Sequence, residues 1–194
     1  MKPTYWCRAL LTALLVAAIA PGASAMGTLE VTAGLSKDDN YGSYNSHGTL
    51  AGGVAFGAGY YWSFAPKLNW GIDVALEDIG SADFTNPLSG DGRIAAKVFR
   101  INPALRIDLS RPAGPSFFGQ IGGGLYNVRT EIKLDAGGST DRSDTKFGGN
   151  LGAGVSFPVA PRIRMNLLGQ YHTVATDEKS TIYFAVRAGL GVSI

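Results

Sequence analysis

Four residues of the types used in acyl transfer occur in the second half of the chain: Asp108, Ser156, His172 and Ser193. A histidine oriented by an acid can deprotonate a serine hydroxyl, which then attacks a carbonyl carbon. Such a set works only when the side chains lie within hydrogen-bond reach. In the strands predicted below, His172 lies near the end opposite to that of the two serines and Asp108. We therefore predict no catalytic site and no enzymatic activity.

A larger set of charged residues falls on a single side of the alternating segments described below. These residues are Glu30, Asp73, Glu77, Arg100, Arg106, Arg164 and Arg187. If that side faces the inside of a narrow barrel, the charges are buried and must pair. We expect Asp73 and Arg100 in one network, joined by Arg187 and Glu30. Two interpretations stay open: a salt-bridge plug that fills the lumen, or a narrow polar conduit gated by the pairs.

No motif for a metal or a nucleotide is present, so we predict no cofactor. Cys7 is the single cysteine, and it lies before the apolar part of the N-terminal segment. The glycine-rich runs contain neither a dinucleotide-binding nor a phosphate-loop motif. The acids around Asp38 and from Asp141 to Asp144 lack calcium-loop spacing and are predicted to be solvated loop residues.

The elements that would position these side chains are strands. From Thr181 to Ile194 apolar residues alternate without a break with small or polar ones, as expected for a strand with two different faces. Seven earlier segments show related alternation, although Pro103 is predicted to mark a bulge. The eight predicted strands are Thr28–Leu35, Leu50–Trp62, Asn69–Glu77, Ala95–Leu109, Phe117–Val128, Phe147–Phe157, Ile163–Thr173 and Thr181–Ile194.

The connections between these strands alternate in length. Long polar loops are predicted at 36–49, 78–93 and 130–145, and a medium one at 174–180, with short turns between them. Bacterial outer-membrane barrels have long outer loops and short periplasmic turns. The pattern predicts an all-β fold: an eight-stranded, antiparallel, up-and-down transmembrane β-barrel with both termini in the periplasm. Because lipid cannot satisfy an open edge, the last strand should pair with the first. The rival interpretation is a secreted β-sandwich.

Aromatic residues gather beside the short turns, where they are predicted to form a girdle at the periplasmic interface. The members of this girdle are Tyr60, Trp62, Trp70, Phe117 and Phe157, with Phe64 and Phe118 next to them. A second girdle near the long loops is predicted from Tyr126, Phe147, Tyr171 and Phe184.

The N-terminus indicates export. Lys2 and Arg8 precede the apolar run Ala9–Ala20, and Ala23-Ser24-Ala25 has the small-x-small pattern of a cleavage site. We predict a signal peptide at 1–25 and a barrel domain at 26–194. Only 16% of the chain is charged, against about 25% in typical soluble domains. Without Lys2 and Arg8, the basic and acidic residues balance at 15 each, which argues against a nucleic-acid partner.

These features resemble the outer-membrane protein β-barrel domain family, the small OmpA- and OmpX-like barrels of Gram-negative bacteria. The resemblance rests on the signal peptide, on glycine-aromatic strands such as Gly119–Tyr126, and on the terminal strand. It implies location in the outer membrane, with lipid, lipopolysaccharide and the outer-membrane assembly machinery as partners. Members usually end in Phe, which helps that machinery to recognise the last strand, whereas this chain ends in Ile194.

Three functions follow in order of preference. The first is a small integral barrel with a structural or surface-interaction role, for which the surface ligand is unknown. The second is a narrow porin-like channel for small or apolar solutes. The third is an enzyme that modifies lipid A, which would need the Ser-His-acid set.

Overall fold

The computed structural model describes residues 27–39, 52–86, 90–109, 114–175 and 180–194. The predicted signal peptide and Leu50 lie outside these residues. The described part forms eight strands: β1 (Gly27–Asp38), β2 (Gly53–Ala65), β3 (Leu68–Asn86), β4 (Gly90–Asp108), β5 (Ser116–Leu134), β6 (Ser139–Ala160), β7 (Ile163–Val174) and β8 (Thr181–Ser193). Within the described ranges, no helix is long and apolar enough to cross a membrane.

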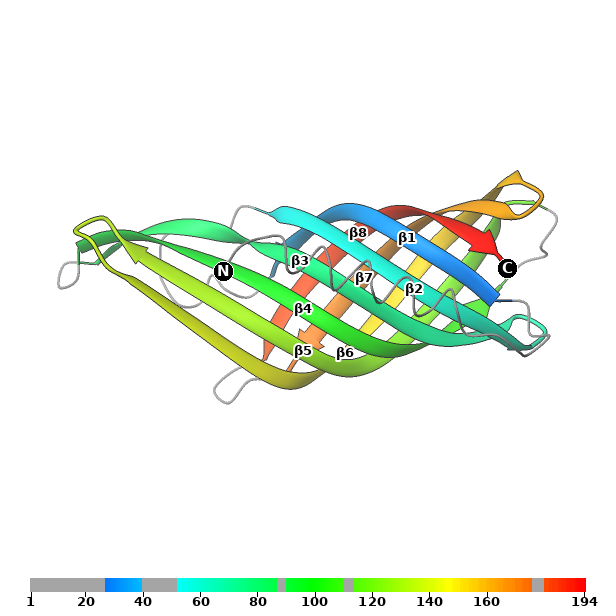
Figure 1. Cartoon of the computed structure of the whole chain (residues 1–194), viewed down its shortest axis with the longest axis horizontal. Coiled ribbons are helices and arrows are strands. Elements are labelled where there is room, and N and C mark those ends of the chain that lie inside the picture. Colours follow the sequence, from blue (N-terminus) through cyan, green and yellow to red (C-terminus); the bar gives the residue numbers. More distant parts are fainter. Residues whose placement is uncertain (1–26, 40–51, 87–89, 110–113, 176–179) are drawn as a thin grey trace.

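The strands follow one another around a closed antiparallel barrel, as predicted (Figure 1). The barrel is closed by β1 and β8, which pair from Thr28 opposite Ser193 to Asp38 opposite Tyr183. Closure leaves no open edge along this part of the wall, as a sheet in lipid requires. Strands β2, β4 and β6 end, and the strands that follow them begin, at the end of the barrel where β1 begins and β8 ends. We call this the turn end and the opposite one the hairpin end.

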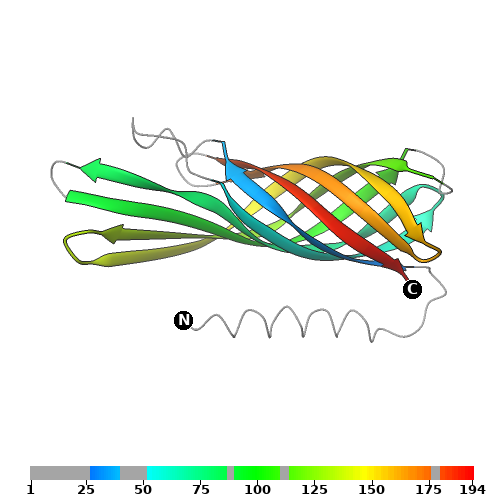
Figure 2. The same cartoon turned by 90° about the horizontal axis from the view of Figure 1, so that it is seen from above.

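Strands β3 to β6 are longer than predicted and extend past the other four at the hairpin end (Figure 2). The predicted loops 78–93 and 130–145 are therefore wrong, because most of their residues form paired strands. A bulge between Asp78 and Gly80 shifts the alternation of β3. Beyond it the inward side chains of β3, β4 and β5 are mostly apolar, as at Phe84, Ile94 and Ile132, and most outward ones are polar. The inward side chains of β6 are polar and include Arg142 and Asp144. The lipid-facing pattern that identified the other strands is thus lost here.

Pro103 does not mark a bulge. It lies opposite Ile72 in a continuous β3–β4 register, and the β4–β5 register is the same on both sides of it. Pro103 faces outward and is exposed, so the missing N–H only interrupts the β4–β5 ladder locally. Bulges occur instead at Ser63/Ala65, Asp78/Gly80 and Pro158/Ala160.

The wall separates two environments. Large apolar side chains such as Val31, Phe56, Leu151 and Leu190 are exposed on its outer surface. Charged and amide side chains are buried inside, which is the polarity expected of a barrel in lipid. Inward glycines give the large interior side chains their room. A Cβ added at Gly57 would lie 2.5 Å from Nη1 of Arg187, and one at Gly154 would lie 2.8 Å from Cε1 of Phe118.

Candidate functional site

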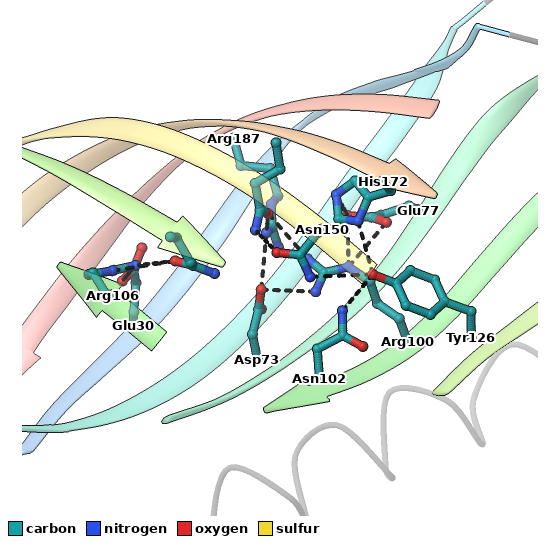
Figure 3. A network of polar contacts seen from close by, with 12 residues as sticks. Glu30, Asp73, Glu77, Arg100, Asn102, Arg106, Tyr126, Asn150, His172 and Arg187 are labelled. Atoms are coloured by element: carbon teal, nitrogen blue, oxygen red, sulfur yellow. Dashed lines mark hydrogen bonds and ion pairs between the residues drawn. The ribbon is translucent and has the colours of Figure 1, made fainter. Parts of the chain in front are cut away.

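The centre of the lumen is occupied by a charged layer of four residues from three strands. Asp73 and Glu77 come from β3, Arg100 from β4, and Arg187 from β8 (Figure 3). Nη1 of Arg100 lies 2.9 Å from Oδ2 of Asp73, and its Nε lies 3.3 Å from both carboxylate oxygens of Glu77. Nη2 of Arg187 lies 3.2 Å from the same oxygen of Asp73. Two arginines and two acids thus balance each other in a layer that is almost wholly buried.

Amides and phenols complete this layer. Gln170 on β7 accepts hydrogen bonds from both Arg100 and Arg187, and its amide nitrogen donates to Asn150 over 3.2 Å. The hydroxyl of Tyr126 lies 2.7 Å from the amide of Asn102 and 3.3 Å from that of Asn150. Side chains from opposite walls therefore meet across the lumen, which binds the walls together and excludes open space at this level.

Arg106 forms a second group nearer the turn end. Its Nη2 lies 2.8 Å from Oε2 of Glu30 and donates to Gln120 over 3.2 Å. The guanidinium lies 4.1 Å from the ring centre of Tyr61 and 4.3 Å from that of Phe118, so it is stacked between two aromatic rings. Glu30 therefore pairs with Arg106 and does not join the central layer (Figure 3).

Arg164 lies apart from both groups, at the turn end. Its Nε donates to the hydroxyl of Ser156 over 2.7 Å, and its Nη2 donates to the hydroxyl of Ser116 over 2.9 Å. It also donates to the backbone oxygens of Gly114 and Ser156. The seven charged residues predicted as one network thus divide into a central layer of four, the Glu30–Arg106 pair and Arg164.

An apolar layer follows on the hairpin side of the charges. Its members are Ile79, Ala96, Val98, Tyr126, Val128, Val174 and Tyr183. Ile79 and Val98 are wholly buried, although they lie inside a barrel whose wall faces lipid. The lumen is therefore filled by ion pairs in its middle and by hydrocarbon above them. Sequence reasoning missed Ile79 as a member of this layer, because it lies in the bulge that shifts the alternation of β3.

The sequence matches the model of the outer membrane protein beta-barrel domain family over residues 9–193. The chain belongs to this family. A comparison with curated protein sequences found no match. The protein is a small outer-membrane β-barrel, and its apolar outer wall lies in the lipid of that membrane.

Solved structures of other barrels share the fold. Neisserial surface protein A is 15% identical, with a TM-score of 0.60, over 87% of this chain and 97% of its own. Ail, the attachment invasion locus protein of Yersinia pestis, solved with the heparin analogue sucrose octasulfate, is 16% identical. Its TM-score is 0.52, over 87% of this chain and 99% of its own. The N-terminal barrel domain of Pseudomonas aeruginosa OprF is 11% identical, with a TM-score of 0.54, over 86% and 97%.

In this outer-membrane barrel, His172 is part of the packed lumen. Its Nδ1 lies 3.3 Å from the hydroxyl of Tyr126, and its ring stacks on Tyr183 with centres 4.4 Å apart. Ser156 lies six residues along β6 from Asn150, the residue opposite His172, which corresponds to about 20 Å. Ser156 bonds to Arg164, and Asp108 accepts a hydrogen bond from Asn69. The structure does not bring the Ser-His-acid set together.

Aromatic side chains surround the outer wall at the turn end. Trp62 and Trp70 lie opposite each other on β2 and β3 and stack with ring centres 4.7 Å apart. Tyr60 meets Trp62 edge-on at 4.7 Å. Phe117 and Phe157 are exposed on the same wall. Phe118 points into the lumen and belongs to the Arg106 group, so its placement beside this girdle was wrong.

The aromatic set near the hairpin end also divides. Phe147, Tyr171 and Phe184 are exposed on the outer wall, whereas Tyr126 is wholly buried in the lumen, so its inclusion in this girdle was wrong. Tyr61 and Gln120 were missed as partners of Arg106. The alternation does carry a signal for Tyr61, because it lies between two outward residues of β2, Tyr60 and Trp62.

Beyond the apolar wall, β3 to β6 continue as a four-stranded sheet that we call the extension, residues 79–86, 90–97 and 128–146. Its outward face carries Asp83, Arg93, Lys97, Arg129, Glu131, Lys133 and Asp141. Arg129 and Asp141 form a bidentate pair, and hydrogen bonding from Arg129 lowers the pKa of Asp141. Charges with large exposed fractions do not belong in lipid, so the extension lies outside the hydrocarbon region.

Proposed function

We propose that this protein is a non-enzymatic surface protein, in which a closed barrel anchors the extension outside the cell for interaction with other molecules. The observation that carries the proposal is the contrast along the barrel axis. Buried ion pairs cross the lumen, whereas the extension exposes charges on its outward face and, on β6, on its inner face as well. A protein with a blocked lumen and an exposed sheet is suited to binding at its surface.

The packing of the lumen argues against the channel. A solute would have to separate Arg100 from both Asp73 and Glu77 and then pass the apolar layer around Val98. Breaking a buried ion pair leaves an uncompensated charge in a medium that solvates it poorly. The buried position of His172, remote from Ser156, likewise supports a protein without enzymatic activity.

The proposed orientation places the turn end and both termini in the periplasm. Its support is the length of the connections, because outer-membrane barrels carry short turns on the periplasmic side. Residues 1–25 are proposed to be a signal peptide removed by cleavage after Ala25, and the assembly machinery is proposed to receive the exported chain through its last strand.

Introduced cysteines test this orientation, since the cleaved chain would carry no cysteine of its own. Ser139→Cys lies at the start of β6, at the hairpin end, and Ala160→Cys at the last residue of β6, at the turn end. A membrane-impermeant thiol reagent should label intact cells only at position 139. Labelling of position 160 alone would invert the orientation.

The strand edges of the extension suggest how it acts. Pairing of β3 with β2 ends at Glu77, and pairing of β6 with β7 ends at Gly148. Within the described ranges, residues 79–86 and 139–145 therefore each have one edge without a neighbouring strand. Unpaired edges can add a further strand, and charges on them limit indiscriminate pairing. Asp141, Arg142 and Asp144 supply such charges on β6.

Trimming the extension separates a surface role from a structural one. In the trimmed variant, residues 84–92 and 132–140 are each replaced by Asn-Gly, which joins opposed residues through a two-residue turn. Cells with no copy, the full chain or the trimmed chain are compared for outer-membrane permeability to a large antibiotic and for binding to host cells and phage. We expect the trimmed chain to keep the permeability of the full chain and to lose binding. Full binding by the trimmed chain would contradict the surface role.

A further inference from the structure

The outward face of β4, β5 and β6 changes polarity in successive rows at the hairpin end. The innermost row consists of exposed apolar side chains, Ile101, Leu125 and Phe147. Two residues further along each strand come Phe99, Asn127 and Thr145, and then Lys97, Arg129 and Ser143. Rows on one face are about 7 Å apart. Hydrocarbon, hydrogen-bonding groups and cations thus follow one another within about 14 Å.

The cationic row places two like charges directly opposite each other. Lys97 on β4 is the cross-strand neighbour of Arg129 on β5, an arrangement that is unfavourable without a counter-charge. Arg129 is oriented by its bidentate contact with Asp141. The structure gives Lys97 no ion pair among the described residues. Its neighbour on β3, Asp78, instead accepts a hydrogen bond from the backbone N–H of Gly80 over 3.1 Å.

The row between the cations and the hydrocarbon carries groups that bind sugars or amides. The amide of Asn127 donates to the hydroxyl of Thr145 over 2.9 Å, and Ser143 donates to the carbonyl oxygen of Asn127 over 3.1 Å. These side chains are exposed, so they keep further hydrogen-bonding capacity toward the surroundings. A free phosphate ion would use only the cations, whereas a membrane lipid would use all three rows.

We propose that this face binds the phosphorylated headgroup of a glycolipid in the surrounding leaflet. The phosphate lies between Lys97 and Arg129, the sugar hydroxyl and amide groups meet Asn127 and Thr145, and acyl chains lie along Ile101, Leu125 and Phe147. The opposite wall lacks this order, because β7 and β8 carry Tyr171 opposite Phe184 and Thr173 opposite Ile182 at the hairpin end. The glycolipid therefore binds to one side of the barrel.

The inference deepens the proposed function and rests on it only for the identity of the leaflet. In the outward leaflet of an outer membrane, the phosphorylated glycolipid is lipopolysaccharide, whose membrane anchor is lipid A. Binding is measured in detergent, where orientation plays no part. A failure of the cysteine labelling above and a failure of lipid binding are thus separate results.

The test is native mass spectrometry of the folded protein with lipid A that carries both phosphates. Near a membrane surface each Lys or Arg contributes affinity equivalent to about fivefold, so Lys97→Gln with Arg129→Gln should weaken binding about thirtyfold. The matched control is Arg93→Gln with Lys133→Gln, an opposed basic pair on the same two strands but about 13 Å further out. It should change binding less than twofold. Lys97→Arg should retain binding, and gel mobility of folded and heated samples reports folding of each variant.

Three further ligands decide the chemistry. Dephosphorylated lipid A should bind as weakly to the normal protein as the intact lipid binds to the double variant. Phosphatidylglycerol, which has a phosphate but no sugar ring, should bind more weakly than lipid A, and inorganic phosphate should not compete at millimolar concentration. Equal loss in the control variant, equal binding of phosphatidylglycerol, or competition by inorganic phosphate would each overturn the proposal.

Discussion

Arg100 with Asp73 and Arg129 with Asp141 are the same kind of pair in two different places. In both, the aspartate lies two residues away from the position directly opposite the arginine on the neighbouring strand. The side chains of the first pair are 0% and 5% exposed, and those of the second are 41% and 43% exposed. The two regions therefore isolate the effect of surroundings on one interaction.

The difference shows where these charges stabilise the protein. In the lumen, protein groups must replace the water that a charge has lost, and Arg100 receives Asp73, Glu77 and Gln170 for this purpose. Removing one member leaves the others without compensation. In the extension, water solvates Arg129 as soon as Asp141 is removed, and such pairs contribute little. Equal geometry thus gives an essential contact in one region and a dispensable one in the other.

The largest expected effect is that of Arg100→Ala. It leaves Asp73 and Glu77 with reduced compensation and should destabilise the barrel by about 3–5 kcal/mol. Folded barrels often migrate faster than unfolded ones on unheated gels, and the temperature midpoint of that shift measures stability. Ile101→Ala is the matched control, because the neighbouring side chain faces lipid. Equal, small shifts for both variants would mean that Arg100 is solvated and that the lumen is open.

A double-mutant cycle sharpens the comparison. Asp73→Ala alone removes an ion-pair partner from both Arg100 and Arg187. The double variant, Arg100→Ala with Asp73→Ala, removes one charge of each sign. The double variant should be more stable than the sum of the single effects by about 1–3 kcal/mol. The same gel midpoints are measured for the normal protein, the two single variants and the double variant. Strict additivity would show that the two side chains do not share a network.

Arg106→Lys tests the second lumen group with the charge retained. Lysine keeps an ion pair with Glu30 within reach but loses the planar stacking between Tyr61 and Phe118. We expect a loss of about 1–2 kcal/mol in the midpoint assay, smaller than for Arg100→Ala. A loss as large as that of Arg100→Ala would show that shape, more than charge, governs the lumen.

The smallest effect is expected for Arg129→Ala in the extension. Its side chain and that of Asp141 are both substantially exposed, so water replaces the lost contact. The gel midpoint should not change measurably, either in low salt or in 0.5 M NaCl. A shift comparable to that of Arg100→Ala would remove the contrast between the two regions.

Much of this architecture was predictable because every strand that crosses the lipid must place apolar side chains on its outward face. Alternation from Thr181 to Ile194 identifies β8. Because successive side chains point to opposite faces of a strand, the apolar neighbours of Asp73 and Arg100 are enough to place these two residues on the inner face. The extension was not predictable by that rule, since outside the hydrocarbon region the outward side chains become polar and the bulge at Asp78/Gly80 shifts the alternation.

The partners inside the lumen were only partly predictable. Parity shows which side chains face inward, but the stagger of the strands determines which of them lie at one level. For this reason Glu30 meets Arg106, although β1 and β8 are neighbours and Arg187 was the expected partner. Phe118 was misplaced for a simpler reason. Gln120 faces inward on the same strand, and Phe118, two residues before it, must therefore face the lumen as well.

The central claim is that the lumen is closed by its own side chains, and single-channel conductance in planar bilayers tests it most directly. The purified, folded protein should give no steady conductance steps in 1 M KCl, because Arg100 and Arg187 bridge the lumen and the apolar layer around Ile79 lies above them. Reproducible steps from the unaltered protein, persisting after repurification, would contradict the closed lumen and support the narrow channel.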